Sequence, residues 1–338
     1  MKGLRLLGWV LLALGMANCA SDSSISDRTT VDAWSQAPNN EIDILWVVDD
    51  SCSMSEEQAA LTQGFVSFVD EMEASGTNFH IGLITTSLDY SDPNRGQLVG
   101  DPPYLTVEDD YISAFQDRAI VGTQGSDKEK GLEAVSYALS PIMTLPGSPN
   151  EGFLREEASL LIVFVSDEED CSDDGALEGR LAEDCYLERQ LLTNVQQIVR
   201  DYWDIKGGDR ERVQVGAIVG LDNGACEDAY PGRRYMDAAA LTGGLIGDIC
   251  SGDWSTILAD LGLTAVGIKT KFRTSYLAKV DTLQVEVDEE EVPQDELNGW
   301  TYDESTWYIS FHGDAIPDRG QQVVARYTIQ PGATPPTE

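Results

Sequence analysis

The stretch WVVDDSCSM, residues 46–54, organises the interpretation of the whole chain. An apolar run ends there in a carboxylate, Asp49, and two alternating hydroxyls follow it, Ser51 and Ser53. Alternate residues of an extended turn face the same way, so these three side chains can point at one spot. Hard divalent cations such as Mg²⁺ bind oxygen donors of this kind. The stretch therefore predicts a strand that delivers oxygen ligands to a loop.

Strand and helix patterns alternate on both sides of this stretch. Nearly continuous apolar runs predict strands covered on both faces, and apolar positions at helical spacing predict the helices between them. Such alternation indicates an α/β fold, a doubly wound, mostly parallel sheet with helices on both faces. The predicted strands lie at residues 42–48, 79–84, 160–165 and 213–219, and the predicted helices at 54–72, 132–139, 187–202, 236–241 and 254–261.

A second acidic strand end follows residues 160–165. Ser166 and Asp167 come directly after this apolar run and begin an acidic segment that continues to Asp170. Ligands of open α/β sheets bind at the carboxyl ends of the strands. Asp49 and Asp167 are therefore expected at the same edge of the sheet.

The periodicity changes from helical to strand-like near Lys271. Apolar residues then alternate with polar ones in three runs, which predicts a small β-sandwich-like module over residues 271–330. Residues 331–338 are expected to form a loose tail. Residues 20–40 are rich in Ser, Asp, Thr and Asn and predict a flexible tether ahead of the α/β domain, residues 41–270.

Composition narrows the classes of partner. Hydrophobic residues make up 42% and charged residues 24% of the 338 positions, which is typical of a globular chain. The formal net charge is −37, which argues against nucleic acid or an anionic membrane surface as a direct partner. The same acidic field concentrates divalent cations near any site that binds them.

The first 19 residues predict an export signal. Lys2 and Arg5 precede an apolar segment that is too short to span a membrane, residues 6–16. The end of the signal resembles a bacterial lipoprotein box, in which Cys19 would be the acylated first residue, although Asn18 departs from the usual small residue. Cleavage after Ala17 is the alternative. The resemblance implies a cell-envelope protein, lipid-anchored to a bacterial membrane on its periplasmic or surface face.

Export permits disulfide bonds. Of the six cysteines, five remain if Cys19 carries lipid, so one is free or pairs outside the chain. Cys226 and Cys250 are a plausible local pair. The pairing among Cys52, Cys171 and Cys185 cannot be read from the sequence.

Three ordered landmarks resemble the von Willebrand factor type A (vWA) family. Residues 47–54 resemble its Asp-x-Ser-x-Ser loop, residues 163–167 its later strand ending in Thr-Asp-Gly, and residues 236–244 its late helix with a Gly-Gly turn. The resemblance covers residues 42–268. It implies the vWA fold, which agrees with the alternation of strands and helices.

The resemblance also implies a metal-ion-dependent adhesion site. Ser51 and Ser53 would bind the cation through their hydroxyls, with Asp49 and Asp167 acting directly or through water. The cation would be Mg²⁺, with Mn²⁺ or Ca²⁺ as alternatives.

One ligand of the family, a Thr from the middle loop, has no obvious counterpart here. Counting back from Gly131 and Leu132 places Ser126 in that position, and Thr123 is the alternative of the expected residue type. Ser126 could instead cap the following helix.

Two residues depart from the family pattern. Cys52 and Glu168 stand where the family has glycine. The first departure suggests a disulfide between Cys52 and Cys171 that would join the two metal loops. The second adds an acid beside the site.

The implied function is binding rather than catalysis. A cation held by few carboxylates and by neutral hydroxyls keeps positive charge and an open position, which suits a carboxylate from a protein partner or another acidic ligand. The chain has two histidines, His80 and His312, so neither a zinc site nor a Ser-His-Asp triad is readily assembled. A structural envelope component with a vestigial metal site and a Mg²⁺-dependent hydrolase are the alternatives.

Overall fold

The computed structural model describes residues 28–36, 41–89, 92, 94–223, 226, 229–318 and 320–331. The predicted signal peptide with Cys19, part of the predicted tether and residues 332–338 of the predicted tail lie outside these ranges. Among the described helices, none has the length and apolar character needed to cross a membrane.

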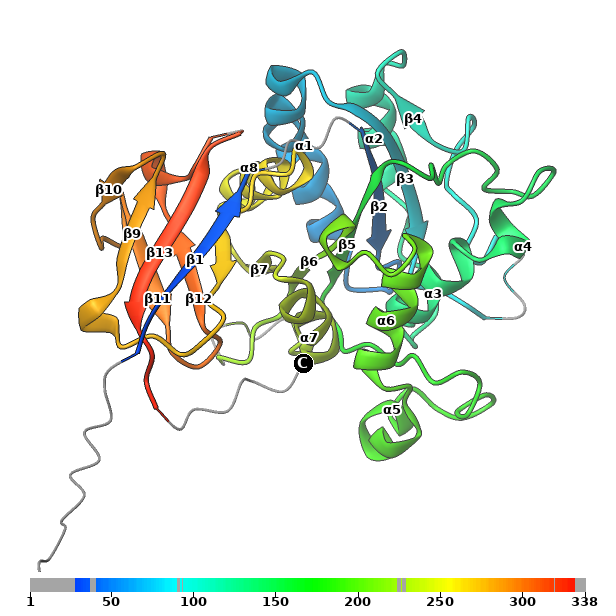
Figure 1. Ribbon diagram of the computed structural model, residues 1–338. Coiled ribbons are helices and arrows are strands. Elements are labelled where there is room, and N and C mark those ends of the chain that lie inside the picture. The colour runs from blue at the N-terminus through cyan, green and yellow to red at the C-terminus, as the bar shows by residue number, and fades with distance from the viewer. Residues whose placement is uncertain are drawn as a thin grey trace, which may run out of the picture.

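A six-stranded sheet forms the centre of the larger part of the molecule (Figure 1). Its neighbouring strands are parallel except for the antiparallel edge pair β3 and β4. The four predicted apolar strands are β2, β3, β5 and β6, and nearly all their side chains are buried, as expected for strands covered on both faces. In order across the sheet, the strands are β4 (Leu105–Thr106), β3 (Asn78–Thr85), β2 (Glu41–Val48), β5 (Ser159–Ser166), β6 (Val213–Val219) and β7 (Ile246–Asp248).

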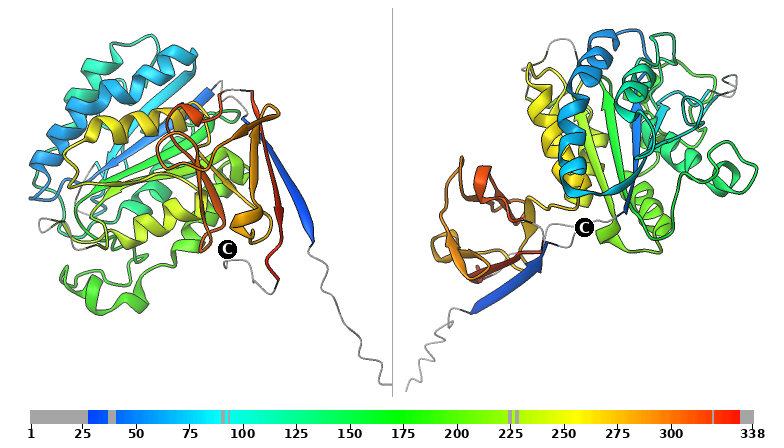
Figure 2. Two further views of the ribbon diagram at one scale, coloured as in Figure 1. Left: turned by 90° about the vertical axis from the view of Figure 1, so that its left-hand side faces the viewer. Right: turned by 90° about the horizontal axis from the view of Figure 1, so that it is seen from above.

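Helices cover both faces of this sheet (Figures 1 and 2). One face packs against α1 (Ser55–Ser75), α2 (Tyr111–Ala119) and α8 (Trp254–Ala265), where Trp46 of β2 meets three phenylalanine rings edge-on. The other packs against α3 (Gly131–Ala138), α6 (Val195–Ile205) and α7 (Arg233–Thr242). The shorter helices are α4 (Pro141–Thr144), α5 (Asp184–Leu187), η1 (Arg189–Leu191), η2 (Arg210–Arg212), η3 (Val280–Thr282) and η4 (Gly313–Ala315).

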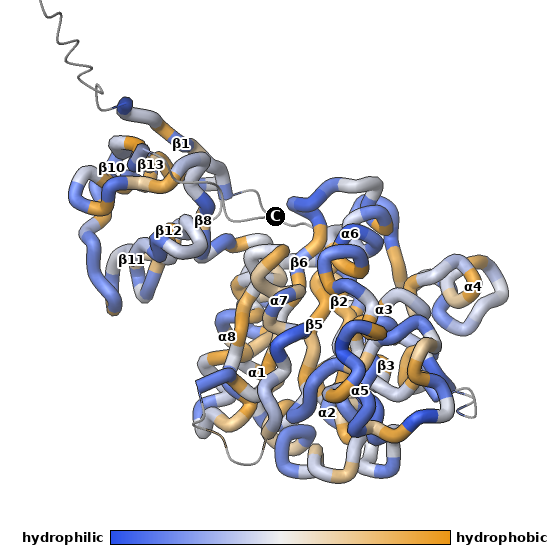
Figure 3. The backbone as a smooth tube through the Cα atoms, turned by 90° about the horizontal axis from the view of Figure 1, so that it is seen from below, coloured by the Kyte–Doolittle hydropathy of each residue, from blue (hydrophilic) through white to orange (hydrophobic). Residues whose placement is uncertain are grey.

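Two antiparallel sheets form a separate β module beside the α/β part (Figure 3). The alternating residues of the C-terminal segment point into one core between them, with Val285, Ile309 and Val323 fully buried. The first sheet contains β1 (Thr29–Ser35), β13 (Gln322–Thr328), β9 (Gln284–Val287) and β10 (Glu290–Val292). The second contains β11 (Trp300–Asp303), β12 (Tyr308–Phe311) and β8 (Lys271–Arg273).

The predicted tether differs from the structure at residues 29–35, which form strand β1. This strand pairs along its full length with β13, nearly 300 positions later in the chain. Its Asp32 carboxylate accepts hydrogen bonds from the Ser275 hydroxyl at 2.8 Å and from the Tyr327 hydroxyl at 2.6 Å. The polar composition is therefore that of an edge strand, whose outward face meets solvent.

The α/β part is inserted between two strands of the β module. The chain leaves β1, builds the α/β part from β2 to α8, and returns at β8. The buried Gln36 side chain holds the two connections together: its amide donates to Lys269 O at 2.8 Å and to Pro317 O at 3.0 Å, and it accepts from Lys269 N at 2.9 Å. One side chain thereby ties the exit from the module to the return into it.

Two disulfides are present in the described residues. The predicted pair Cys226–Cys250 is confirmed. Cys171 pairs with Cys185, fourteen positions along the chain, and both lie in a small apolar cluster with Leu177.

Candidate metal centre

The two acidic strand ends meet at one edge of the large sheet. Strands β2 and β5 pair in parallel with Val48 opposite Val165. The backbone N–H of Asp49 continues this ladder by donating to Val165 O at 3.0 Å. Asp49 and Asp167 each follow the last residue of their strand, so the sheet itself places the two carboxylates side by side.

Asp49 is fully buried and held by short hydrogen bonds. Its Oδ1 accepts from the backbone N–H of Ser51 at 2.8 Å and its Oδ2 from the Ser166 hydroxyl at 2.6 Å. Burial raises the pKa of Asp49 to about 7; these hydrogen bonds oppose the shift and the charge of Asp167 adds to it. The carboxylate is rigidly placed in surroundings that disfavour its charge.

The loop after Asp49 adds hydroxyls to this cluster. The Ser51 and Ser53 hydroxyl oxygens lie 3.4 Å apart. Burial raises the pKa of Asp167, and a hydrogen bond from the Ser53 hydroxyl opposes that shift. Asp167 Oδ1 is buried and has no hydrogen-bond partner among the described residues. The four predicted ligands Asp49, Ser51, Ser53 and Asp167 therefore belong to one group of oxygen atoms.

Glu129 is part of this group, and the sequence analysis missed it. Its side chain comes from the loop before α3 and is only 1% exposed. Burial, followed by the charges of Asp49 and Glu168, raises the pKa of Glu129 to about 10. Burial also raises the pKa of Glu168, and the hydrogen bond from Glu129 opposes that shift. The raised pKa favours a proton on Glu129, whose Oε1 is buried and has no hydrogen-bond partner among the described residues. Glu168 in place of glycine is the one sign of this pair in the sequence.

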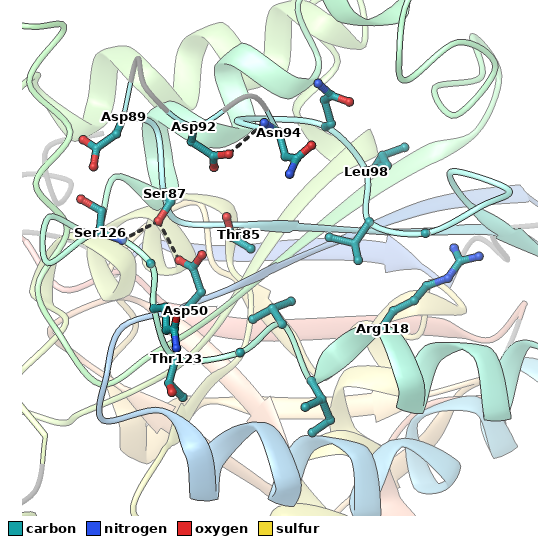
Figure 4. Close-up of a pocket in the computed structure, with 18 of the residues that line it drawn as sticks. Asp50, Thr85, Ser87, Asp89, Asp92, Asn94, Leu98, Arg118, Thr123 and Ser126 are labelled. Atoms are coloured by element: carbon teal, nitrogen blue, oxygen red, sulfur yellow. Dashed lines mark hydrogen bonds between the residues drawn. The ribbon is translucent and has the colours of Figure 1, made fainter.

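The predicted middle-loop ligands Ser126 and Thr123 line a neighbouring pocket of about 1100 Å³ instead (Figure 4). The Ser126 backbone N–H donates to the Ser87 hydroxyl at 2.8 Å, which donates to Asp50 Oδ1 at 2.8 Å. Neither Ser126 nor Thr123 is a hydrogen-bond partner of Asp49 in the described part of the chain. Ser126 does not cap α3 either, because that helix begins at Gly131 with Lys130 as its N-cap. The backbone N–H of Gly125 donates to the Asp50 carbonyl at 2.7 Å, which holds this loop against Asp50.

The suggested disulfide between Cys52 and Cys171 is wrong. Cys52 is free and exposed at the rim of the site. Cys171 is 1% exposed, and its backbone N–H donates to Glu129 O at 2.6 Å. That contact leaves the thiol inside the small apolar cluster, where Cys185 meets it.

The donor set fits a hard divalent cation. The charges that act on Asp49, Glu129 and Glu168 are those of other carboxylates. Buried carboxylates are costly unless they are paired, protonated or bound to a metal. Within the described ranges, no group of three or more His, Cys, Asp or Glu side chains is arranged to hold a metal ion. A cation here would therefore need the hydroxyls of Ser51 and Ser53 as well.

Glu129→Gln is expected to stabilise the metal-free protein at pH 8. The pKa of Glu129 lies near 10 in the folded chain and near 4.3 in an unfolded chain. The contribution of this carboxyl to the free energy of unfolding is fully present below about pH 4.3. It is lost as the pH rises through the pKa of Glu129 in the folded chain. Glutamine stays neutral, so it avoids the cost of a buried charge. In EDTA at pH 8 the Tm should therefore rise by at least about 2–4 °C, which is the shift produced by a gain of about 1 kcal/mol in the free energy of unfolding of a chain of this size.

Calorimetric melts at pH 5 and pH 8 check this. The gain should shrink at pH 5, and Glu56→Gln, at an exposed position of the first turn of α1, should show no gain at either pH. Equal Tm values for Glu129→Gln and the parent chain at pH 8 would contradict a protonated Glu129.

Both histidines lie in local structural contacts. His80 Nδ1 is 2.8 Å from Phe153 O, and its ring stacks on Tyr104. His312 Nε2 is 2.8 Å from the Thr301 hydroxyl in the β module. Both rings therefore make contacts within their own part of the structure.

No protein-family model matches the chain, and no curated protein matches it. Among solved structures, the chain is similar to the pilus adhesin SpaC from Lactobacillus rhamnosus GG, with a TM-score of 0.40 and 13% identity over 90% of this chain and 44% of that one. It is similar to an adhesive tip pilin from Group B Streptococcus agalactiae, with a TM-score of 0.34 and 11% identity over 90% of this chain and 82% of that one. It is also similar to proximal thread matrix protein 1 from the mussel byssus, with a TM-score of 0.40 and 13% identity over 72% of this chain and 51% of that one. The chain thus spans less than half the length of SpaC.

Proposed function

We propose that this chain is a vWA-type binding protein that captures its ligand through a divalent cation, with Mg²⁺ as the first candidate and Mn²⁺ or Ca²⁺ as alternatives. Asp49, Ser51, Ser53 and Asp167 would hold the cation. Binding rather than catalysis is its role in this proposal. The observation that carries the proposal is a set of oxygen donors at the ends of two adjacent parallel strands: Asp49, Ser51 and Asp167 are buried, Ser53 is exposed, one carboxylate oxygen of Asp167 has no hydrogen-bond partner, and among the described residues no cationic side chain pairs with either carboxylate.

The charge of the site decides which ligand it suits. Asp49 and Asp167 together balance one divalent cation. A protonated Glu129 adds no charge, and Glu168 is already hydrogen-bonded to it. Two of the four donors are neutral hydroxyls, so the cation would keep an open position for an incoming oxygen anion, which favours a carboxylate from a protein partner or another acidic ligand. An ionised Glu129 would add a further negative charge and weaken this attraction, so the raised pKa of Glu129 supports the choice.

The proposed location is the outside of a bacterial membrane. Acylation of Cys19 would anchor the chain, and the segment between Cys19 and β1 would link the anchor to the β module. The metal site would then lie in the α/β part, which is separate from the β module that carries the link to the anchor.

Affinity capture from a native envelope extract tests the proposed function. The chain should retain its partner in Mg²⁺ and release it in EDTA, and Asp49→Ala should retain nothing. Glu56→Gln serves as the matched control, because this exposed carboxylate lies near the site but outside the donor set. Capture that EDTA and Asp49→Ala leave unchanged would rule the proposal out.

A structural envelope component with a vestigial site is the second candidate, and the Glu129–Glu168 pair favours it. Two carboxyl groups that share a proton are partly neutralised without any metal. Calorimetry with Mg²⁺ and Mn²⁺ separates the two functions. Saturable binding supports metal-dependent capture, and its absence supports the structural role.

A further inference from the structure

A second hollow lies where the β module meets the α/β part. It measures about 230 Å³, and both parts line it. Strand β8 forms the module's wall and faces the α/β part (Figure 3). The opposite wall includes residues of η2 and the first residues of β6. Since β6 runs parallel to β5, this hollow lies at the opposite edge of the sheet from Asp167.

Four cationic side chains line this hollow, which we call the basic cleft: Arg210, Lys269, Lys271 and Arg273. One carboxylate, Glu211, lines it with them and pairs with Lys269. The whole chain has 22 Lys and Arg residues against 59 Asp and Glu residues. A cluster of four cations around one lining carboxylate, with Asp303 of β11 acting on Lys271, still runs against the charge of the molecule and requires a local reason.

Strand geometry places two of these cations together. Side chains alternate along a strand, so Lys271 and Arg273 share one face of β8 while Phe272 between them is buried in the module core. The Arg273 position pairs with Tyr308 on β12, whose ring also lines the cleft. Alternation thus places both cations on the face of β8 opposite to the Phe272 side chain, and all three residues line the hollow.

The other two cations are held by their surroundings. The Arg210 guanidinium lies 4.4 Å from the centre of the Trp203 ring. The backbone of Lys269 is bound on both sides by the Gln36 amide, at 2.8 Å and 2.9 Å. Charges that are already positioned lose less freedom when a ligand binds.

Size and charge define the class of ligand. Sites for drug-sized molecules measure roughly 300–1000 Å³, so a cleft of about 230 Å³ suits a smaller group. Arginine forks match the oxygens of phosphate in pairs, and lysines add point charges. The acidic remainder of the chain repels long polyanions. We propose that the basic cleft binds a small phosphate-bearing group, either free or as the headgroup of an anionic lipid.

Titration of the full chain with inorganic pyrophosphate in EDTA tests this proposal. Saturable binding is expected, and the double variant Lys271→Gln, Arg273→Gln should weaken it by about tenfold or more, because it removes two charged hydrogen-bond donors. Arg326→Gln is the matched control, since this arginine lies in the same module but pairs with Glu286 away from the cleft. Lys269→Gln, on the connection rather than in β8, should also weaken binding.

Vesicle sedimentation at low salt separates the two sources of phosphate. Sedimentation with phosphatidylglycerol vesicles but not phosphatidylcholine vesicles, lost in the double variant, identifies a lipid headgroup. Pyrophosphate binding without sedimentation identifies a free phosphate ligand. The proposal is overturned if neither pyrophosphate binding nor sedimentation with phosphatidylglycerol vesicles is seen. It is also overturned if the parent chain, Lys269→Gln and the double variant bind pyrophosphate with equal affinity and have unchanged melting temperatures. Because EDTA is present throughout, failure of the metal site does not affect this outcome.

Discussion

Asp49→Asn is expected to abolish Mg²⁺ and Mn²⁺ binding while leaving the metal-free fold intact. Removal of a carboxylate ligand takes away a negative charge that the cation requires, so affinity should fall by about 100-fold or more, which corresponds to about 2.7 kcal/mol. Asparagine has the same shape, and its oxygen can still accept from the Ser51 backbone N–H. Its amide can donate to the Ser166 hydroxyl, the present partner of Asp49 Oδ2. In EDTA at pH 8 the Tm should be equal to or above that of the parent chain, because the pKa of Asp49 near 7 makes its charged form costly.

The adjacent residue supplies the control. Asp50 points to the other side of the loop, where its Oδ1 accepts from the Ser87 hydroxyl at 2.8 Å (Figure 4). Asp50→Asn should therefore keep its affinity for Mg²⁺ in isothermal titration calorimetry. Equal metal affinity in Asp49→Asn and the parent chain would show that the cation binds elsewhere.

Asp43→Asn is expected to produce the largest loss of stability. Asp43 is fully buried in β2, and its carboxylate accepts from Arg155 Nε at 2.7 Å and from Lys206 Nζ at 3.2 Å. The Lys206 side chain is 1% exposed, and burial lowers its pKa while Asp43 opposes that shift. Loss of the carboxylate would leave the buried Lys206 without its counterion and Arg155 with only Glu41, 3.9 Å away, which costs about 3–5 kcal/mol. The Tm should fall by roughly 10 °C in a chain of this size.

An exposed ion pair provides the comparison. Asp222 and Arg233 lie 2.8 Å apart, with side chains that are 59% and 43% exposed. Because solvent screens such a pair, Asp222→Asn should leave the melting temperature almost unchanged. Calorimetric melts of both variants at pH 7 check the contrast. Similar small losses for both would mean that the Asp43 network does not stabilise the α/β part.

The large sheet and the meeting of Asp49 with Asp167 could be predicted because both depend on local pattern. A continuous apolar run is a strand covered on both faces, and the carboxyl ends of adjacent parallel strands lie at one edge. The pairing of Val48 with Val165 shows how closely this brings the two carboxylates. Cys226–Cys250 could be proposed for a similar reason, since its partners are neighbours along the chain.

Glu129 could not be predicted in this way. Its loop has no periodicity, so the direction of each side chain depends on what the loop packs against. Here the contact between Cys171 N and Glu129 O directs the glutamate into the cluster, and Ser126 faces the Asp50 pocket. The same contact explains why Cys171 pairs with Cys185 and leaves Cys52 free.

The sequence by itself determined the strands, the helices and the two acidic strand ends, because hydrophobic periodicity and residue type act over a few neighbouring positions. Only the tertiary structure decided that residues 29–35 belong to the β module, because their partner strand β13 begins at Gln322. It alone also brought Arg210 and Lys269 to the face of β8 that carries Lys271 and Arg273. Contacts between distant segments depend on how entire faces of helices and sheets pack together. The pattern of residues within one segment does not predict this packing.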